Sequence, residues 1–258
     1  MDISVLTINI AGVQFDWFGE RRKSLIKEIN QLNPDVIFLQ ESTIVFKSSY
    51  DQTQDISQKT GLKHFAFSPY GNDREYESER LGGVSILSRW PFKHVQNRKL
   101  PSGTIDKYGA RVALMAMIEL DETDVVLATT HLTWRPEERK VRVAQMETFL
   151  DMVNFSDELT IFGGDFNASP EDPSVQSCRD IFDDAYFNLH GDKDGVTWCQ
   201  STNKYIKSTW RGDARIDYLF CSKDIEVMSA EVVMKKENPV YPSDHFGVLA
   251  TFNIDVLT

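Results

Sequence analysis

Short apolar runs recur from one end of the chain to the other, and they restrict the fold more than any other feature. They are rich in Val, Ile, Leu and Phe and are bounded by turn formers, as is typical of buried strands. Strands that are apolar on both faces must be covered on both sides. The runs are Ile3–Ile8, Val36–Leu39, Gly83–Leu87, Val112–Ile118, Val125–Ala128, Leu159–Phe162, Ile216–Cys221 and Gly247–Phe252.

Two segments have the spacing of amphipathic helices instead. Residues 20–32 and residues 136–153 repeat apolar side chains three and four positions apart. Pro136 stands at a suitable first helical position, and Glu137 and Glu138 follow in the first turn, where negative charge suits the helix dipole. Such helices supply one cover for the strands, and a second sheet can supply the other.

Nothing in the 258 residues divides the chain, which has no internal repeat, low-complexity tract or Pro-, Gly- or Ser-rich linker. A chain of this length can bury most of the surface that its unfolded form exposes. The three cysteines lack a CxxC spacing, so neither a disulfide framework nor a structural zinc site is indicated. We therefore expect a single domain over residues 1–258.

The formal net charge of −11 bears on the choice of partner. Proteins that hold nucleic acid mainly through its phosphates usually carry a basic face, so this balance counts against a non-specific DNA binder. It is compatible with a site that holds a divalent cation. The N-terminus shows no secretory signal, and no run reaches the ~18 apolar residues of a membrane span. We expect a cytoplasmic monomer without a membrane span.

Polar residues of chemical interest stand at the ends of these runs. Four runs finish at such a residue, and two later runs begin at one. If the last two strands run opposite to the first four, all these groups meet at one edge of the sheets, where loops carry function on a rigid scaffold. They are Asn9, Glu41, His131, Asp165 and Asn167 after strands, and Asp217, Asp244 and His245 before strands.

Each of these residues alone has a simpler explanation. Asn9 can cap a turn, Glu41 can be a solvated strand end, and His131 can be a hydrogen-bonded packing histidine. Asp165 follows a Gly-Gly turn signal, and Asp217 can form a structural ion pair. Repeated coincidence at strand ends favours one shared site over several unrelated turns.

The stretches that carry these residues also form a set of motifs. Taken together, this chain resembles the endonuclease/exonuclease/phosphatase superfamily over nearly its whole length. The resemblance implies a four-layer α/β/β/α fold, with two mixed sheets face to face and helices outside. The matching stretches are Leu6-Thr-Ile-Asn9, Val36-Ile-Phe-Leu-Gln-Glu41, Gly83-Val-Ser-Ile-Leu-Ser-Arg89, Thr129-Thr-His-Leu132, Gly163-Gly-Asp-Phe-Asn167, Arg215-Ile-Asp-Tyr-Leu-Phe220 and Ser243-Asp-His-Phe246.

The residue types suit hydrolysis of a phosphate ester, which needs a placed water, neutralised charge and a stabilised leaving oxygen. Glu41 is a hard oxygen ligand for Mg²⁺, with Asn9 close by and Asp244 as a supporting carboxylate. Mn²⁺ is the alternative ion, and the scarcity of Cys and His ligands disfavours zinc.

The remaining residues are candidates for the chemistry itself. Asp165 can orient or deprotonate water, and the amide of Asn167 can donate to a phosphate oxygen. Asp217 and His245 resemble the family's carboxylate–histidine pair, and His131 resembles its second phosphate-side histidine. The sequence leaves open whether Asp165 or His245 is the base.

Substrate contacts are expected from side chains near these motifs. Arg111 stands where relatives often carry an arginine opening a strand, with a structural ion pair as its alternative role. Trp134 and Arg135 follow the His131 strand directly. Trp210, with Trp198, bounds a loop containing Lys204, Lys207 and Arg211, and such aromatic and cationic residues can stack a base and hold a strand. A surface loop with partly buried tryptophans is the simpler alternative.

These features predict a Mg²⁺-dependent phosphodiesterase, with nucleic acid as the first substrate class to test. A phosphomonoesterase acting on a small or inositol phosphate is the alternative hydrolase. The 5-phosphatase branch carries a Trp-Cys-Asp-Arg motif where this chain has Arg215-Ile-Asp-Tyr218, which weakens that hypothesis. An inactive binding module is the alternative of another class, and the intact motif residues disfavour it.

Overall fold

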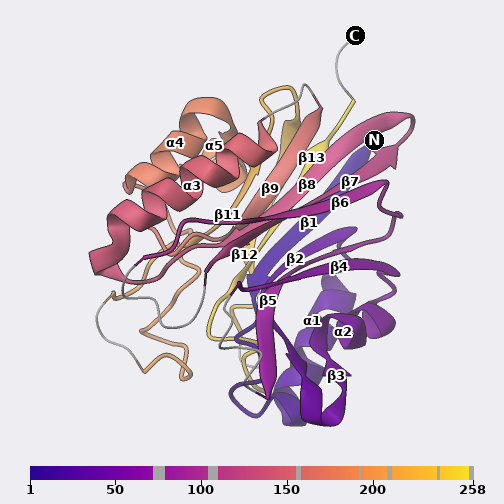
Figure 1. The fold of residues 1–258 in the computed structure, drawn as a ribbon, viewed down its shortest axis with the longest axis vertical. Helices are drawn as coiled ribbons and strands as arrows, with labels where there is room; N and C mark the ends of the chain where they lie inside the picture. Colours follow the sequence, from indigo (N-terminus) through magenta and orange to yellow (C-terminus); the bar gives the residue numbers. More distant parts are fainter. Residues whose placement is uncertain are drawn as a thin grey trace.

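The computed structural model describes residues 1–71, 79–103, 110–154, 158–191, 193–207, 211–236 and 239–255. Two sheets lie face to face, and helices cover the outer face of each sheet (Figure 1). The predicted α/β/β/α architecture is thereby confirmed. In the part of the chain that is described, no helix is long and apolar enough to cross a membrane.

The first sheet combines strands from both ends of the chain. Its order is β12-β13-β1-β2-β5-β4, and β3 pairs with β2. Strands β1 and β2 are parallel, and β13 runs antiparallel to β1. The strands are β1 (Asp2–Asn9), β2 (Val36–Val45), β3 (Tyr50–Asp51), β4 (His64–Pro69), β5 (Arg80–Ser88), β12 (Glu226–Val233) and β13 (Gly247–Asn253).

The second sheet has the order β10-β11-β9-β8-β7-β6. Strands β8 and β9 are parallel, and β11 is antiparallel to β9. The starts of β11 and β13 therefore lie beside the ends of β9 and β1, as the sequence predicted. The strands are β6 (His94–Lys99), β7 (Val112–Leu120), β8 (Thr123–His131), β9 (Leu159–Asp165), β10 (Asp183–Asp184) and β11 (Asp217–Cys221).

Helices α1 (Arg22–Leu32) and α2 (Gln52–Thr60) cover the first sheet, and α3 (Arg139–Val153) and α4 (Pro173–Ile181) cover the second (Figure 1). Helix α5 (Ala185–His190) contacts β11 and β12. Both predicted helices begin later than expected. A π-helical turn, η1 (Trp17–Arg21), precedes α1, and a 3₁₀ turn, η4 (Pro136–Glu138), precedes α3; a further 3₁₀ turn, η2 (Phe46–Ser48), follows β2.

Side-chain alternation decides what enters the space between the sheets. In β9, Leu159 and Ile161 belong to the core between the sheets, whereas Phe162 packs on the helix side. Gly163 and Asp165 therefore share the inner side with Ile161. The same alternation turns the ends of β1 and β8 and the start of β11 inward, which puts Asn9, His131 and Asp217 at the same end of this core.

Gly164 has a conformation that other residues rarely adopt. Its φ is 146°, and a Cβ added there would lie 2.0 Å from the carbonyl oxygen of Thr130 on β8. Only glycine lets β9 stay this close to β8 immediately before Asp165.

Phe162 lies in the core between the second sheet and its helices, where a substitution can test the packing. It is fully buried, meets Phe149 and Phe182 edge to face, and stacks on Phe220 at a centroid distance of 5.3 Å. Phe162→Ala should lower the free energy of unfolding by about 3–5 kcal/mol, measured by urea denaturation. Met228→Ala, at a half-exposed position of β12, should change it by less than about 0.5 kcal/mol. A loss below about 1 kcal/mol for Phe162→Ala would mean that the core does not depend on this ring.

Candidate active site

The register of the second sheet aligns three polar residues in one row. His131 of β8 pairs with Asp165 of β9, and Asp165 pairs with Asp217 of β11. Histidine Nε2 lies 3.2 Å from Asp165 Oδ2. On its other oxygen, Asp165 accepts a hydrogen bond of 2.9 Å from the backbone N–H of Asn167, whose φ of 52° is left-handed. The local turn after β9 thus brings the Asn167 side chain back toward His131.

Asp165 also joins this row to the first sheet. The amide Nδ2 of Asn9 donates to Asp165 Oδ2 at 3.0 Å and to Glu41 Oε1 at 3.1 Å. Its carbonyl Oδ1 accepts from the backbone N–H of Ala11 at 2.9 Å, which fixes the orientation of the amide. Asn9 therefore links a carboxylate from each sheet.

Glu41 reaches the site because β2 is bulged. The pairing of β2 with β5 shifts between Gln40 and Ser42, and Glu41 has a left-handed φ of 60°. Gln40 points between the sheets, where its Nε2 donates to Thr129 Oγ1 at 3.0 Å. In a regular strand the next side chain would turn away from that space; a bulge can redirect it. The backbone N–H of Glu41 donates to the hydroxyl of Tyr70 at 3.2 Å, which holds the bulge.

His245 and Asp217 form a buried pair. Histidine Nδ1 lies 2.9 Å from Asp217 Oδ2, and Nε2 lies 3.8 Å from Asp165 Oδ2. The edge of the imidazole packs against Trp198 at a centroid distance of 5.0 Å. Burial by itself would lower the pKa of His245, but Asp217 and Asp165 raise it to about 10. Burial raises the pKa of Asp165 to about 7. The arrangement thus favours an imidazolium beside a carboxyl group that can exchange a proton near neutral pH.

His131 has the opposite character. Its Nδ1 lies 2.8 Å from the hydroxyl of Tyr70 and 3.1 Å from Nη1 of Arg111. On the other side of the ring, Nε2 lies 3.0 Å from the amide Nδ2 of Asn167 and 3.2 Å from Asp165 Oδ2. Burial and the charge of Arg111 hold the pKa of His131 well below its usual value. His131 is therefore a neutral imidazole in this arrangement.

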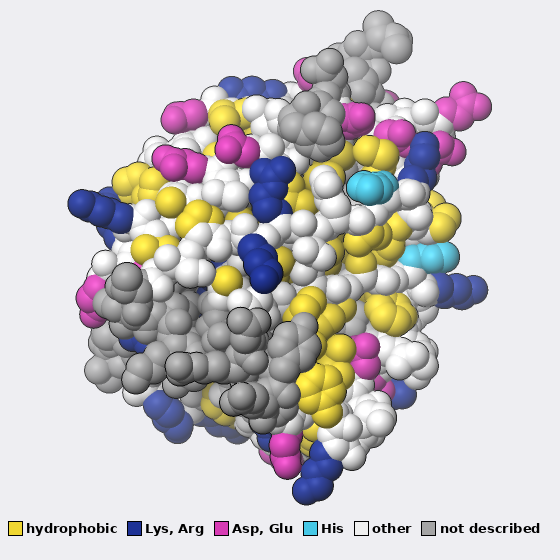
Figure 2. Space-filling view, in the orientation of Figure 1, with side chains coloured by type: hydrophobic (Ala, Val, Ile, Leu, Met, Phe, Trp, Pro, Cys, Tyr) yellow, Lys and Arg dark blue, Asp and Glu magenta, His cyan; other side chains and the backbone are white. Residues whose placement is uncertain are grey.

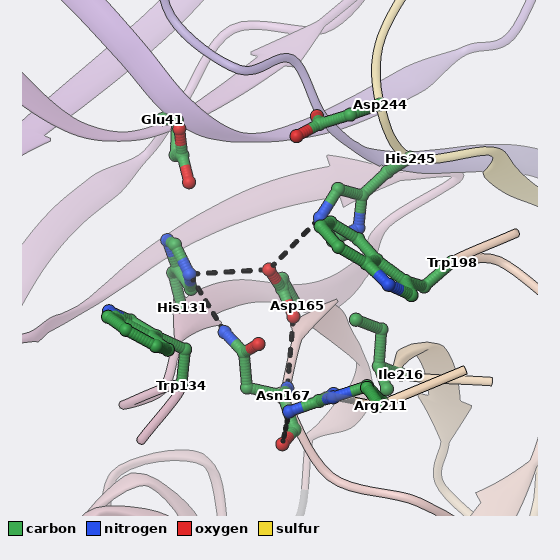
Figure 3. A pocket seen from close by; sticks show the side chains of 10 residues that line it. All are labelled: Glu41, His131, Trp134, Asp165, Asn167, Trp198, Arg211, Ile216, Asp244 and His245. Carbon is green, nitrogen blue, oxygen red and sulfur yellow. Dashed lines mark hydrogen bonds and ion pairs between the residues drawn. The ribbon is translucent and has the colours of Figure 1, made fainter. Parts of the chain in front are cut away.

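A cavity of about 220 Å³ opens over this network. Figure 3 shows Glu41 and Asp244 on one side of it, His131 and Trp134 on another, and Trp198 beside His245. Nη2 of Arg211 donates to the backbone oxygen of Asn167 at 2.9 Å. The lining residues are Glu41, His131, Trp134, Asp165, Asn167, Trp198, Arg211, Ile216, Asp244 and His245.

Among the described residues around the cavity, two groups of side chains offer metal-ligand atoms. Asp165, Asp217 and His245 place such atoms within 4.8 Å of one another, but these three residues are already joined by close polar contacts. Glu41 and Asp244 form the second group. Burial and the charge of Asp244 raise the pKa of Glu41, because two carboxylates repel each other there. A divalent cation would relieve that repulsion, and carboxylate oxygens suit a hard ion such as Mg²⁺.

The structure brings most of the candidate residues from the sequence to one place. Glu41, His131, Trp134, Asp165, Asn167, Asp244 and His245 line the cavity, and Asn9 and Asp217 lie directly behind it. Arg111 is buried behind His131 and is absent from the cavity lining, as is Arg135, whose guanidinium stacks on Trp134 at 4.8 Å. Trp210 lies outside the described residues.

Comparison with known proteins agrees with this geometry. The model of the endonuclease/exonuclease/phosphatase family matches residues 6–245. The chain belongs to this family. The resemblance predicted from the sequence motifs is thus confirmed, and the match extends from β1 to His245.

Relatives of this family member include tyrosyl-DNA phosphodiesterase 2 of Xenopus tropicalis. It is 24% identical over 97% of this chain and 66% of the relative, so the chain spans about two thirds of that protein's length. The fold is similar to truncated TDP2 of Caenorhabditis elegans, with a TM-score of 0.78, 23% identity and 98% of each chain covered. It is also similar to the human Nocturnin catalytic domain, with a TM-score of 0.76, 23% identity, and 98% of this chain and 93% of that chain covered.

Three site residues had no clear signal in the sequence. Tyr70 follows β4, an edge strand with weak apolar patterning, and Ile216 looked like the start of a strand. Arg21 lies beneath the loop after β1 and is fully buried, which no motif indicates. For Trp198 and Arg211, which line the cavity, the sequence indicates only membership of an aromatic and basic loop.

The carboxylate of Asp172 stabilises the segment that carries Trp134, which lines the cavity. One of its oxygens accepts from the backbone and hydroxyl of Ser174, and the other accepts from Arg142 at 3.1 Å. Arg142 in turn donates to the carbonyl oxygens of Thr133 and Arg135, on either side of Trp134. Burial favours a higher pKa for Asp172, but the hydrogen bonds from Ser174 and Arg142 outweigh it and lower that pKa.

This carboxylate should stabilise the fold in a pH-dependent way. Asp172→Asn should lower the free energy of unfolding by on the order of 1–3 kcal/mol at pH 7. Because the native pKa lies below the unfolded one of about 3.9, the contribution is present above that value and is lost as the pH falls through the native pKa. Urea unfolding at pH 7, 5 and 3 should show the difference from the parent shrinking only at pH 3. A constant difference, or an equal one for the exposed Asp121→Asn, would contradict this.

Proposed function

We propose that this chain is a Mg²⁺-dependent phosphodiesterase that hydrolyses a phosphoester bond at the end of a nucleic acid. The observation that carries the proposal is the meeting of three side chains around one cavity: Asp165 from the end of β9, Glu41 from the bulge in β2, and His245 from the loop before β13. Family membership supports hydrolysis of a phosphate ester. The relatives named as tyrosyl-DNA phosphodiesterases support the DNA-end substrate.

The protein's own side chains divide the work of in-line hydrolysis. Asp165 orients the attacking water and takes its proton, for which a pKa of about 7 is suited. His245, kept as imidazolium by Asp217, donates from Nε2 to a phosphoryl oxygen. The amide of Asn167, held against the neutral ring of His131, adds a second donor beside it, so developing negative charge is met by positioned donors.

The carboxylates of Glu41 and Asp244 are the ligands that we assign to the metal, and Asn9 orients Glu41. Mg²⁺ bound there would withdraw charge from the phosphoryl group. Oxygen ligands without sulfur favour Mg²⁺, with Mn²⁺ as the alternative, over zinc.

The walls of the cavity indicate how a nucleic-acid end is held. Trp134 and Trp198 both line it and offer aromatic faces or edges, and Arg211 supplies a cation beside Asn167. On the face shown in Figure 2, Lys and Arg side chains are interspersed with Asp and Glu across the described residues, without one continuous basic patch. Recognition by the cavity therefore suits a strand end better than a long phosphate track in an acidic protein.

Three substrates separate the alternative functions: a 5′-phosphotyrosyl oligonucleotide, bis-p-nitrophenyl phosphate and p-nitrophenyl phosphate. The protein should hydrolyse a 5′-phosphotyrosyl oligonucleotide and bis-p-nitrophenyl phosphate with Mg²⁺, and EDTA should abolish both activities. Glu41→Gln should reduce turnover to the level seen with EDTA. Without metal this variant should melt at a higher temperature than the parent, because a repelled carboxylate becomes neutral.

Other outcomes would favour a different function. Preference for p-nitrophenyl phosphate would favour a phosphomonoesterase, and absence of turnover on all three substrates would favour an inactive binding module. Parental activity in Glu41→Gln would remove Glu41 from the metal site.

His245 gives the second test. His245→Ala should lower kcat on the order of 10² to 10⁴-fold at saturating Mg²⁺, because a charged donor to the phosphoryl group is lost. Asp217→Asn should lower kcat less, since the imidazole remains but its positive charge is no longer stabilised. A loss below tenfold for His245→Ala would rule out the proposed role.

A further inference from the structure

Arg21 is a cation inside the protein with only 1% of its surface exposed. It lies at the end of η1, and its side chain runs under the loop that follows β1. The guanidinium stacks over the ring of Trp17, with Cζ 4.7 Å from the ring centroid. Burial lowers the pKa of Arg21 to about 10, which leaves it charged at neutral pH. Burying a charged group costs free energy unless its hydrogen-bond donors are satisfied, so the hydrogen-bond partners of Arg21 indicate its role.

The hydrogen bonds of the Arg21 guanidinium go to four backbone oxygens. Three acceptors belong to the loop after β1: Ile10 at 2.7 Å, Gln14 at 3.0 Å, and Gly12. The fourth is Pro242, 221 residues further along the chain, at 3.0 Å. Within the described residues, no ion pair joins Arg21 to a carboxylate. The guanidinium therefore connects two backbone segments instead of neutralising an acid.

The two connected segments lie next to the proposed metal ligands: one holds Glu41 of β2 through the side chain of Asn9, and the other carries Asp244. Ile10 directly follows Asn9, which holds Glu41, and Pro242 stands two residues before Asp244. A second bond joins the same segments, because Ser243 Oγ donates to the carbonyl oxygen of Asn9 at 2.6 Å. The spacing between Glu41 and Asp244 thus depends on these cross-links between the loop after β1 and the loop before β13.

We propose that Arg21 is a positioning residue that sets the separation of Glu41 and Asp244 for a divalent cation. This inference rests on the proposed metal site. The positive charge of Arg21 also offsets the two carboxylates, which both favour its protonated form. The cross-linking role and the charge of Arg21 predict opposite effects of its substitution on cation binding. Loss of the cross-link weakens cation binding, whereas loss of a nearby positive charge alone would strengthen it.

A guanidinium suits this task better than an ammonium. It presents five N–H donors in one plane, which lets it reach carbonyl oxygens on two segments together. Lysine keeps the charge but offers a compact head group that cannot span the same set of acceptors. Arg21→Lys therefore separates geometry from charge.

The test measures direct binding of Mn²⁺ to the full chain. Binding is detected as a decrease in the EPR signal of the free ion. Arg21→Lys should raise the Kd for Mn²⁺ at least fivefold, and Arg21→Met should raise it as well. The matched control is Arg22→Lys, at the next position, whose guanidinium pairs with Asp55 on α2 away from the cavity. The control should lower the melting temperature but keep the parental Kd.

Several outcomes would overturn the inference. A parental Kd in Arg21→Lys with a cooperative melt would show that the cross-link does not position the ligands. Tighter binding in Arg21→Met would show that charge alone matters. If Arg21→Lys does not fold, Ser243→Ala removes the second bond between the same segments; an unchanged Kd in that variant would equally refute the proposal. Glu41→Gln is the reference: if it leaves Mn²⁺ binding intact, the proposed metal site itself is wrong.

Discussion

The carboxylate of Asp165 is the contact on which the arrangement of the site depends. It belongs to the second sheet, yet it accepts a hydrogen bond from Asn9 of the first sheet, while His131 and His245 lie within 4 Å of the same oxygen. Its other oxygen fixes the turn that carries Asn167. One buried carboxylate therefore couples the packing of the two sheets to the geometry of the cavity. The close approach of β9 to β8 at Gly164 places it there.

The charges around this carboxylate come from different layers of the fold. Glu41 and Asp244 lie toward the first sheet, and His245 approaches from the loop before β13. Arg21 and Arg111 are both buried behind the cavity, one bound to backbone oxygens and the other to His131. With Glu41 and Asp244 on one side of the cavity and His245 and Arg211 also lining it, the cavity is suited to a metal ion together with an anionic substrate. The negative net charge of the chain is thus compatible with phosphate chemistry confined to one site.

Two site residues adopt backbone conformations that are uncommon outside glycine. Glu41 has φ 60° in a bulge, and Asn167 has φ 52° after β9. Such conformations cost free energy and persist when surrounding contacts enforce them. Here the hydroxyl of Tyr70 holds the first, and Asp165 holds the second. Tyr70 also contacts His131, so the bulge on one sheet and the histidine on the other share a single tyrosine.

The sequence alone determined eight of the strands, two of the helices and the family, because apolar runs and the combined GGDFN, RIDYLF and SDH motifs are strong local signals. It did not reveal α2, α4 and α5, which are short and carry many polar residues. It also missed the edge strands β4, β6 and β12, where exposure weakens the apolar pattern, and the two-residue strands β3 and β10.

Which face of each strand looks inward was decided by the tertiary structure. Runs such as Val36–Leu39 and Val125–Ala128 are apolar at every position, so alternation along them cannot distinguish the side of the second sheet from the side of the helices. The bulge that redirects Glu41, and the burial of Arg21 between two distant loops, depend on contacts made only when both sheets are assembled. Residue identity supplied the chemistry of the site; packing of one sheet on the other supplied its geometry.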